Sequence, residues 1–171
     1  MHFLLASFLC CAMTATIFTA CGSDEDEPQI PAEDTKPGLA CDAEIIDKWH
    51  RARGFAMIGY HYVVMPDGSI EHGRPLFYQG AHCKEHGMNA KSIGICYVGG
   101  RKVKGEQMQY ADTRTEQQKY TLRKLIHLLR ERYPGVQVVG HRDFNPGKAC
   151  PCFDAKAEYS RADIDASTFS T

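Results

Sequence analysis

The chain has 171 residues, enough for one domain of ordinary size and too few for two independent enzymes. Its 20 basic and 21 acidic residues give a formal charge of -1, so the overall balance offers no polybasic surface and we expect no nucleic-acid partner. With 43% hydrophobic and 24% charged residues, the composition is that of a folded globular domain and excludes a largely disordered chain.

The first 20 residues are predicted to form a signal peptide. Residues 3–20 are apolar or small and carry no charge, over about the length that a secretory signal requires. The run ends in Phe18-Thr19-Ala20-Cys21, which resembles a bacterial lipobox. We therefore expect lipidation of Cys21, a membrane attachment through that lipid anchor, and an exported outer-membrane lipoprotein that is periplasmic or surface-exposed. A buried helix is the plainer interpretation of the same run.

Residues 21–40 are predicted to be an acidic tether, and residues 41–171 the folded domain. Between residues 22 and 40 there are six acidic residues and one basic residue, a composition too charged to bury a core. From residue 41 onward there are 19 basic and 15 acidic residues, so the domain itself carries a charge of +4. A mildly cationic domain suits an anionic polymer as its substrate.

The first half of the domain is predicted to begin with a helix and continue with short strands. A helix over residues 42–53 has Asp42 available as its N-cap and Gly54 placed to end it. Residues 60–65 and 69–71, separated by Pro-Asp-Gly, have the pattern of a hairpin. Residues 92–98 form a further apolar strand, and the polar residues 101–112 are predicted to be a surface loop.

The second half is predicted to contain the main helix. Thr115 and Gln118 have the spacing of a capping box, and an apolar stripe follows as far as Tyr133. Residues 136–140 then form a short strand that ends directly before His141. Because helices and strands alternate along the chain, we expect an α/β fold in which helices pack on a mixed β-sheet.

The densest cluster of reactive residues runs from His141 to Cys152. The chain has eight cysteines and eight histidines, and His and Cys are the usual ligands of zinc. By spacing alone, an ordinary surface histidine and a buried cysteine are the favoured interpretation of the cluster, ahead of a metal site. Cys150 and Cys152 can otherwise form a disulfide with each other, or one of them can pair with Cys41 or Cys83. Loss of residues 1–20 and lipidation of Cys21 would leave five domain cysteines, an odd number that argues against a complete disulfide framework.

Several motifs together resemble those of a known family. In order and at similar spacing, the chain resembles the zinc-dependent N-acetylmuramoyl-L-alanine amidases, the group of T7 lysozyme and the peptidoglycan recognition proteins. The resemblance covers residues 44–154, and its main motifs are Gly59-Tyr60-His61-Tyr62, Gly73-Arg74-Pro75, Gly80-Ala81-His82, Ser92-Ile93-Gly94-Ile95, Gly140-His141-Arg142-Asp143 and Lys148-Ala149-Cys150-Pro151-Cys152-Phe153-Asp154. It implies the fold of those proteins, peptidoglycan or muropeptides as the partner, and one zinc ion per chain.

The resemblance also implies roles for individual residues. His141 and Cys150 fall on two of the family's three zinc ligands, Lys148 and Tyr60 on residues that assist the reaction, and His82 on a position near the substrate. Zinc with three protein ligands keeps one water and lowers its pKa to about 7, which suits hydrolysis of an amide bond. Lys148 and Tyr60 would stabilise the oxyanion and relay protons. Side chains alternate along a strand, so His61 is interpreted as structural.

The family's third zinc ligand has no counterpart. It is a histidine on a first apolar strand, and in this chain the strand is predicted to be missing or replaced. Cys41 and His50 are the candidate substitutes by position, and loss of a ligand predicts weak zinc binding. Residues 9–16 are alternatively a remnant of the first strand rather than part of a signal peptide.

The predicted function is hydrolysis of the amide bond between N-acetylmuramic acid and L-alanine by a zinc-activated water. Two alternatives remain open from the sequence. The first is a zinc-less module that binds peptidoglycan and has lost catalysis. The second is a surface-tethered protein that uses the fold to bind another partner.

Overall fold

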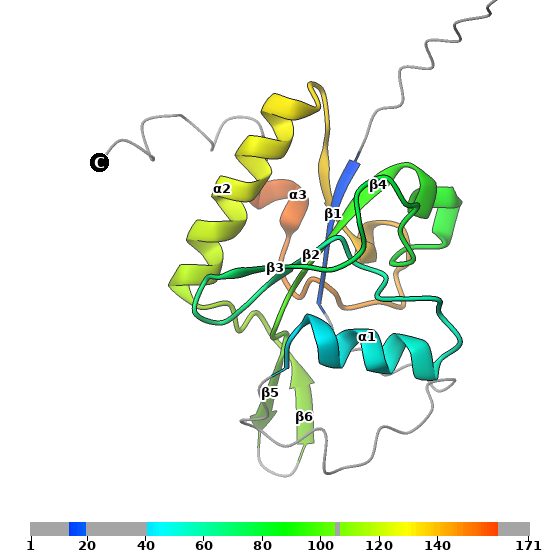
Figure 1. The fold of residues 1–171 in the computed structure, drawn as a ribbon. Helices are drawn as coiled ribbons and strands as arrows, with labels where there is room; N and C mark the ends of the chain where they lie inside the picture. The colour runs from blue at the N-terminus through cyan, green and yellow to red at the C-terminus, as the bar shows by residue number, and fades with distance from the viewer. Residues whose placement is uncertain (1–13, 20–40, 105–106, 161–171) are drawn as a thin grey trace, which may run out of the picture.

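The protein is built around a five-stranded mixed sheet, seen in a computed structural model that describes residues 14–19, 41–104 and 107–160 (Figure 1). The strand order is β3-β2-β4-β1-β7. The pairs β2–β4, β4–β1 and β1–β7 are parallel, and β3 is antiparallel to β2. The described bounds of these strands are β1 (Thr14–Thr19), β2 (Tyr62–Val64), β3 (Ile70–His72), β4 (Ser92–Tyr97) and β7 (Val138–Gly140). The predicted α/β architecture with a mixed sheet is confirmed.

The first strand is present, so the expectation that it is missing or replaced is wrong. β1 pairs with β4 from Thr14 opposite Ser92 to Thr19 opposite Tyr97, and with β7 through Ile17 opposite Gly140. It therefore lies between β4 and β7 in the sheet and is hydrogen-bonded to both of them. Buried backbone N–H and C=O groups need hydrogen-bond partners, and β1 supplies them to the facing edges of β4 and β7.

β1 lies within the 20 residues assigned to a signal peptide. Cleavage before Cys21 would remove the strand, so β1 in the mature protein and a cleaved signal peptide exclude each other. The structure matches the alternative in which this part of the chain belongs to the fold. Residues 1–13, Cys21 and the rest of the predicted tether lie outside the described residues.

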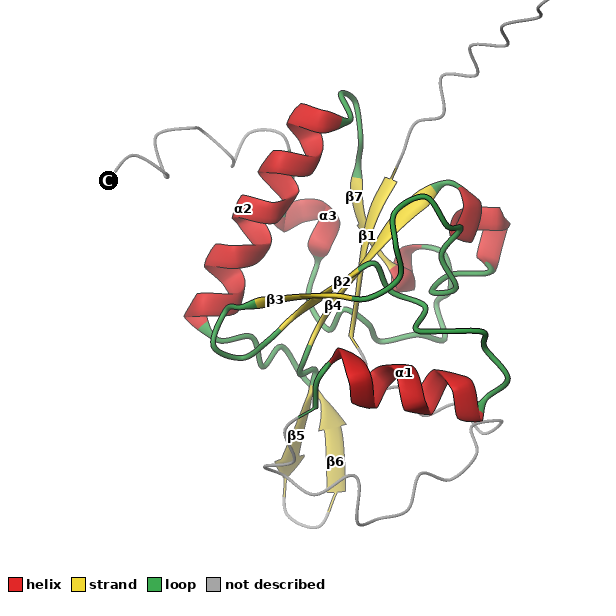
Figure 2. Ribbon diagram, in the orientation of Figure 1, coloured by secondary structure: helices red, strands yellow, loops and turns green. Residues whose placement is uncertain are grey.

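Two helices cover opposite faces of the sheet (Figure 2). In α1 (Ala43–Ala52), the Asp42 side chain accepts a hydrogen bond from the Ile45 N–H at 2.8 Å, as expected of an N-cap. In α2 (Glu116–Arg132), Thr115 and Gln118 form the predicted capping box. The apolar stripe of α2 is buried, and it packs with Ile93, Ile95 and Tyr97 of β4.

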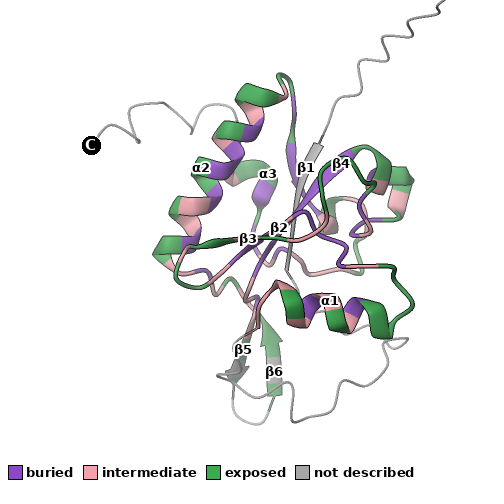
Figure 3. Cartoon of the chain, viewed as in Figure 1, coloured by how far each residue is buried: buried purple, intermediate pink, exposed green. Residues whose placement is uncertain are grey.

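Because side chains alternate along a strand, each face has its own core. Val64 packs on the α2 face, whereas its neighbour Val63 packs with Ile46 of α1. A short helix, α3 (Ala155–Glu158), completes the α2 face. Figure 3 shows burial concentrated on the strands between the helices.

One predicted loop is instead a hairpin. β5 (Arg101–Lys104) and β6 (Gln107–Tyr110) pair antiparallel and form a separate two-stranded ribbon. The Arg101 guanidinium lies over the Tyr110 ring at 5.2 Å, across the two strands. Apolar residues are few in this segment, and its polar composition led to the prediction of a loop. None of the helices among the described residues is long and apolar enough to cross a membrane.

Candidate metal centre

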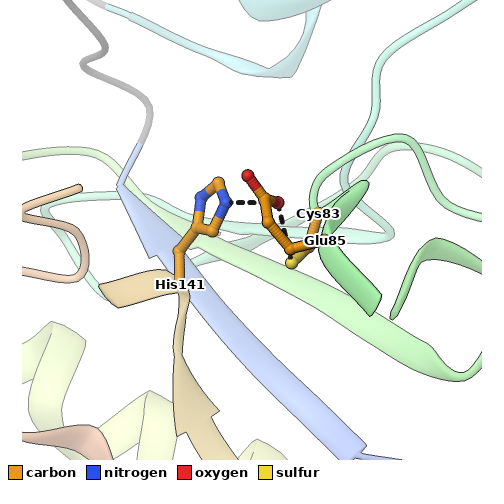
Figure 4. Close-up of side chains that lie close together, drawn as sticks. All are labelled: Cys83, Glu85 and His141. Atoms are coloured by element: carbon orange, nitrogen blue, oxygen red, sulfur yellow. Dashed lines mark hydrogen bonds and ion pairs between the residues drawn. The ribbon is translucent and has the colours of Figure 1, made fainter. Parts of the chain in front are cut away.

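Three potential metal ligands converge next to the end of β7. His141 is the first residue of η3 (His141–Asp143), Glu85 is the first of η2 (Glu85–Ala90), and Cys83 precedes Glu85 by two residues. One ligand atom of each lies within 4.8 Å of the others (Figure 4). His141 Nε2 is 3.0 Å from Glu85 Oε2, and Cys83 Sγ is 3.4 Å from the same oxygen. We call these three residues the Cys-Glu-His cluster.

The loop that carries Cys83 and Glu85 is held by backbone hydrogen bonds. The Asn89 side-chain oxygen accepts from the N–H groups of His82 and Cys83, both at 2.7 Å. His86 and Gly87 follow Glu85 with positive φ angles of 52° and 68°, which turns the chain back sharply. Asn145 donates to the other carboxylate oxygen of Glu85 at 2.9 Å, so both oxygens of that side chain are oriented.

Close contact between the loop and β4 depends on glycine. A Cβ at Gly94 or at Gly80 would overlap the imidazole ring of His82. The absence of a side chain at both positions lets His82 pack directly against the strand. Because Cys83 directly follows His82, this packing also fixes the position of Cys83 relative to the sheet.

The charges of the cluster favour a cation. Burial opposes ionisation of Glu85, but hydrogen bonds that include those from Asn145 and His141 outweigh it and lower the pKa of Glu85 to about 2. Burial, followed by the hydrogen bond to Glu85, raises the pKa of the Cys83 thiol to about 12. The thiol is therefore protonated beside a carboxylate at neutral pH. A divalent cation would displace its proton, because thiolate is the form that binds metal.

The donor set fits zinc. Imidazole nitrogen, carboxylate oxygen and thiolate sulfur are its three usual protein ligands, with bonds that place neighbouring ligand atoms of a tetrahedral site about 3.3–3.6 Å apart. The distances from Glu85 Oε2 to His141 Nε2 and to Cys83 Sγ, 3.0 and 3.4 Å, are close to that spacing. The His141 and Glu85 side chains are 12% and 17% exposed, so the cluster is sheltered and still reachable from solvent.

Cys150, predicted from the resemblance as a zinc ligand, lies near the Cys-Glu-His cluster but outside it. It is half-buried and packs against the same core as Cys83, and its charge contributes to the raised pKa of Cys83. Its carbonyl accepts from the Arg142 N–H at 3.0 Å, which ties it to the segment that begins with His141. The Tyr97 hydroxyl donates to the Pro151 carbonyl at 2.8 Å and fixes the same segment to β4.

The other predicted site residues occupy two places. Tyr60 is buried in the α1-side core, and its ring is stacked on that of His82 with centroids 6.4 Å apart. Lys148 lines a surface hollow of about 410 Å³ together with Tyr110, Arg142 and Cys152. Its N–H donates to the carbonyl of Asn145, whose side chain contacts Glu85. Lys148 is therefore connected to the cluster through Asn145.

Three histidines have roles in packing. His82 is only 7% exposed, and burial lowers its pKa to about 3, so its ring is neutral and packed in the core, and its contact with substrate stays a prediction. The His61 ring accepts from the Gly94 N–H at 2.9 Å and contacts the Tyr78 carbonyl at 3.2 Å, which confirms its structural role. His50 accepts from the Gly59 N–H at 2.9 Å, so that ring nitrogen is occupied.

Neither Cys41 nor His50, the two residues considered as the third zinc ligand from their sequence position, belongs to the Cys-Glu-His cluster. His50 is held in the packing just described, and Cys41 packs at the edge of the α1-side core. Sequence reasoning missed Cys83 and Glu85, although the Gly80-Ala81-His82 motif ends one residue before Cys83. The only available signal was the Cys-x-Glu pattern itself, and nothing in the sequence relates it to a histidine 56 residues further on.

A mixed sheet with helices on both faces is the fold of solved amidases and peptidoglycan recognition proteins. The amidase LysC of Clostridium intestinale superposes with a TM-score of 0.64 at 23% identity, over 94% of this chain and 87% of that chain. Human PGRP-IBETAC, solved in complex with glycosamyl muramyl pentapeptide, superposes with a TM-score of 0.59 at 20% identity, over 86% of this chain and 80% of that one.

The sequence profile of the N-acetylmuramoyl-L-alanine amidases matches residues 27–153. The endolysin of Enterobacteria phage T3 is 34% identical over 153 residues, which is 90% of this chain and 90% of that protein. The chain belongs to the type 2 N-acetylmuramoyl-L-alanine amidase family, and its activity is that of a peptidoglycan amidase.

Proposed function

We propose that the protein hydrolyses the amide bond between the lactyl group of N-acetylmuramic acid and L-alanine, and that a zinc ion held with His141 is required. The observation that carries this proposal is the convergence of His141 with carboxylate and thiol ligands at the end of β7 in a chain of this family. When bound there, zinc supplies a Lewis acid and a water that ionises near neutral pH.

The chain's own residues bind and orient the reacting groups. The Tyr60 ring is held by its contacts with His82 and His50, so its hydroxyl is directed by rigid packing rather than by a flexible loop. We assign to it a hydrogen bond to the oxyanion or a proton transfer to the leaving amine. Lys148 lines a surface hollow. We assign to its ammonium group the attraction of an anionic cell-wall fragment and the stabilisation of the developing oxyanion.

The reaction is tested by release of L-alanine amino termini from purified peptidoglycan. We expect release by the wild-type protein and none after chelation of the metal. Activity that resists the chelator and is blocked by thiol alkylation would refute the zinc mechanism in favour of a cysteine nucleophile. Binding to insoluble peptidoglycan without release of termini would favour a zinc-less recognition module, and failure to bind would favour an interaction protein with another partner.

Lipidation at Cys21 is a separate proposal that competes with retention of β1. The measurements are fractionation of cells that express the wild type or Cys21→Ala, and mass determination of the mature N-terminus. A lipidated N-terminus at Cys21, lost in Cys21→Ala, would establish the anchor and show that the mature fold lacks β1. A chain that keeps residues 14–19 would exclude it.

A further inference from the structure

We propose that residues 75–79, in the loop that follows β3, form a binding surface for the sugar rings of the peptidoglycan glycan strand. The proposal rests on the proposed function and deepens it, because it specifies how the protein holds the polymer beside the amide bond that it cleaves. We call residues 75–79 the aromatic loop, since Phe77 and Tyr78 are its two residues with aromatic rings.

The aromatic loop exposes large apolar side chains to solvent. Leu76, Phe77 and Tyr78 are 44%, 81% and 51% exposed, and Phe77 has the highest exposure among the large hydrophobic residues of the described part of the chain. The ring centroids of Phe77 and Tyr78 lie 4.6 Å apart, so the two rings contact each other and present one continuous surface. Burial of aromatic rings is favourable, and adjacent rings left in water mark a surface that a partner covers.

Hydrogen bonds hold the aromatic loop in a fixed position. The Arg74 guanidinium donates to the Gln79 carbonyl at 2.6 Å and to the Ile58 carbonyl at 2.8 Å, which ties the end of the loop to the segment before β2. The Tyr78 N–H donates to the Pro75 carbonyl at 3.0 Å and closes a turn. A surface that is fixed before binding loses little conformational entropy when a ligand covers it. The exposure of the two rings is therefore a feature of the fold.

The aromatic loop adjoins the proposed reaction site. The Tyr78 carbonyl contacts His61 Nε2 at 3.2 Å, and the His61 ring meets the His82 ring edge to face with centroids 5.8 Å apart. His82 is in turn stacked on Tyr60, which is proposed to act on the scissile bond. The chain then continues directly into the segment that carries two members of the Cys-Glu-His cluster. A polymer bound at the reaction site therefore passes close to the aromatic loop.

The chemistry of the substrate identifies the part of the polymer that the loop contacts. The scissile amide is joined through a lactyl group to a sugar of the glycan strand, so the neighbouring sugars lie beside the site. The C–H groups on the face of a sugar ring pack on aromatic rings, whose π faces carry partial negative charge. The loop sequence, Pro-Leu-Phe-Tyr-Gln, has no charged side chain, whereas recognition of the stem-peptide carboxylates calls for cations. This composition favours the glycan strand over the stem peptide.

The experiment measures the binding of sugar in the absence of stem peptide. The probe is a soluble oligomer of N-acetylglucosamine, titrated against the full chain. Phe77→Ala should weaken its binding by about 10-fold, whereas Phe77→Tyr, which keeps a ring, should bind within about twofold of the wild type. Leu128→Ala and Tyr120→Ala are the matched controls, because these side chains on α2 are 51% and 50% exposed, and both variants should bind as the wild type does.

Hydrolysis provides a second measurement. With intact peptidoglycan, Phe77→Ala should raise KM by about 10-fold and leave kcat unchanged, because the contact with distant sugars is the same in the ground state and the transition state. With a single N-acetylmuramoyl peptide, which has no neighbouring sugar, both constants should stay at wild-type values. Because Phe77 is exposed, its truncation should leave the free energy of unfolding unchanged in a denaturant titration.

The proposal is overturned if the wild type does not bind the oligomer, or if Phe77→Ala binds it as tightly as the wild type. It is also overturned if Phe77→Ala leaves sugar binding unchanged and instead dissociates a wild-type dimer or abolishes binding to phospholipid vesicles, since the loop then serves another partner. These outcomes leave the proposed amidase activity standing. Conversely, oligomer binding that depends on Phe77 in a protein that releases no L-alanine termini would refute the proposed function and leave the glycan surface intact.

Discussion

The two faces of the sheet are built from different kinds of side chain. The α2 face is a largely apolar core in which Leu122, Ile126 and Ile95 are fully buried, beside the buried side chains of Gln118 and Arg114. The α1 face buries the same strands but adds Tyr60, Cys83, Cys96 and three histidines. Buried polar groups are costly unless they are hydrogen-bonded, so a protein keeps them where they have a use. The α2 face therefore provides stability, and the α1 face carries the chemistry.

The largest expected effect comes from the metal cluster. His141→Ala should lower the rate of L-alanine release by about 10³-fold or more, because loss of the ion removes several kcal/mol of transition-state stabilisation. Its free energy of unfolding, measured in chelator, should stay close to that of the wild type. If the folded variant releases L-alanine at the wild-type rate, the cluster is not the reaction centre.

Tyr60→Phe keeps the ring packed on His82 and removes only the hydroxyl. We expect L-alanine release to fall by about 10²–10³-fold, since a donor to the oxyanion contributes about that much. Zinc content should be unchanged. The comparison of kcat with KM is informative, because a purely structural role would alter stability without lowering kcat in the folded protein.

Leu122→Ala tests the opposite face. Leu122 is fully buried under α2, and its truncation should lower the free energy of unfolding by about 2–5 kcal/mol. Denaturant titration measures the loss, and zinc content and kcat of the folded fraction should stay at wild-type values. A variant with intact stability and reduced metal content would contradict the division between the two faces.

The buried histidine His50 predicts acid sensitivity of the α1 face. Burial lowers the pKa of His50 from about 6.5 to about 4, so the ring is neutral in the folded chain and protonated in the unfolded chain between these values. The unfolded state then binds more protons, and stability falls as pH falls through this window. The contribution of His50 to the loss at pH 5 is on the order of 1–2 kcal/mol, and the buried His82 ring adds to the total in the same direction.

Denaturant titrations at pH 7 and pH 5 measure this loss, with His50→Gln as the comparison. The amide of Gln can still accept the hydrogen bond from the Gly59 N–H but does not titrate, so the variant should lose less stability than the wild type. Equal losses in the two proteins would assign the acid sensitivity to other groups.

The smallest effect belongs to the start of α2. Thr115→Ala removes the side chain that accepts from the Gln118 N–H at 3.0 Å and should cost about 1 kcal/mol. In a chain of this size that corresponds to a drop of about 2–4 °C in Tm, with unchanged activity. A larger drop, accompanied by loss of zinc, would show that the two faces are coupled through β4.

Local patterns predicted most of the elements and their limits. The apolar stripe and the capping box located α2 to within a residue or two, and Asp42 marked the start of α1. These predictions succeeded because caps and periodicity are properties of adjacent residues. The hairpin of β5 and β6 escaped detection because its strands are short and mostly polar, and they pair through the backbone.

The sequence by itself determined the mixed α/β architecture, the family, and the presence of His141 at the end of a strand, since each depends on residues close together in the chain or on motifs in fixed order. Only the tertiary structure decided that residues 14–19 complete the sheet, because an apolar run of that length suits a strand and a signal peptide equally. Only the tertiary structure brought Cys83 and Glu85 to His141, because strand pairing and the close packing of His82 on Gly94 set distances that sequence separation does not contain.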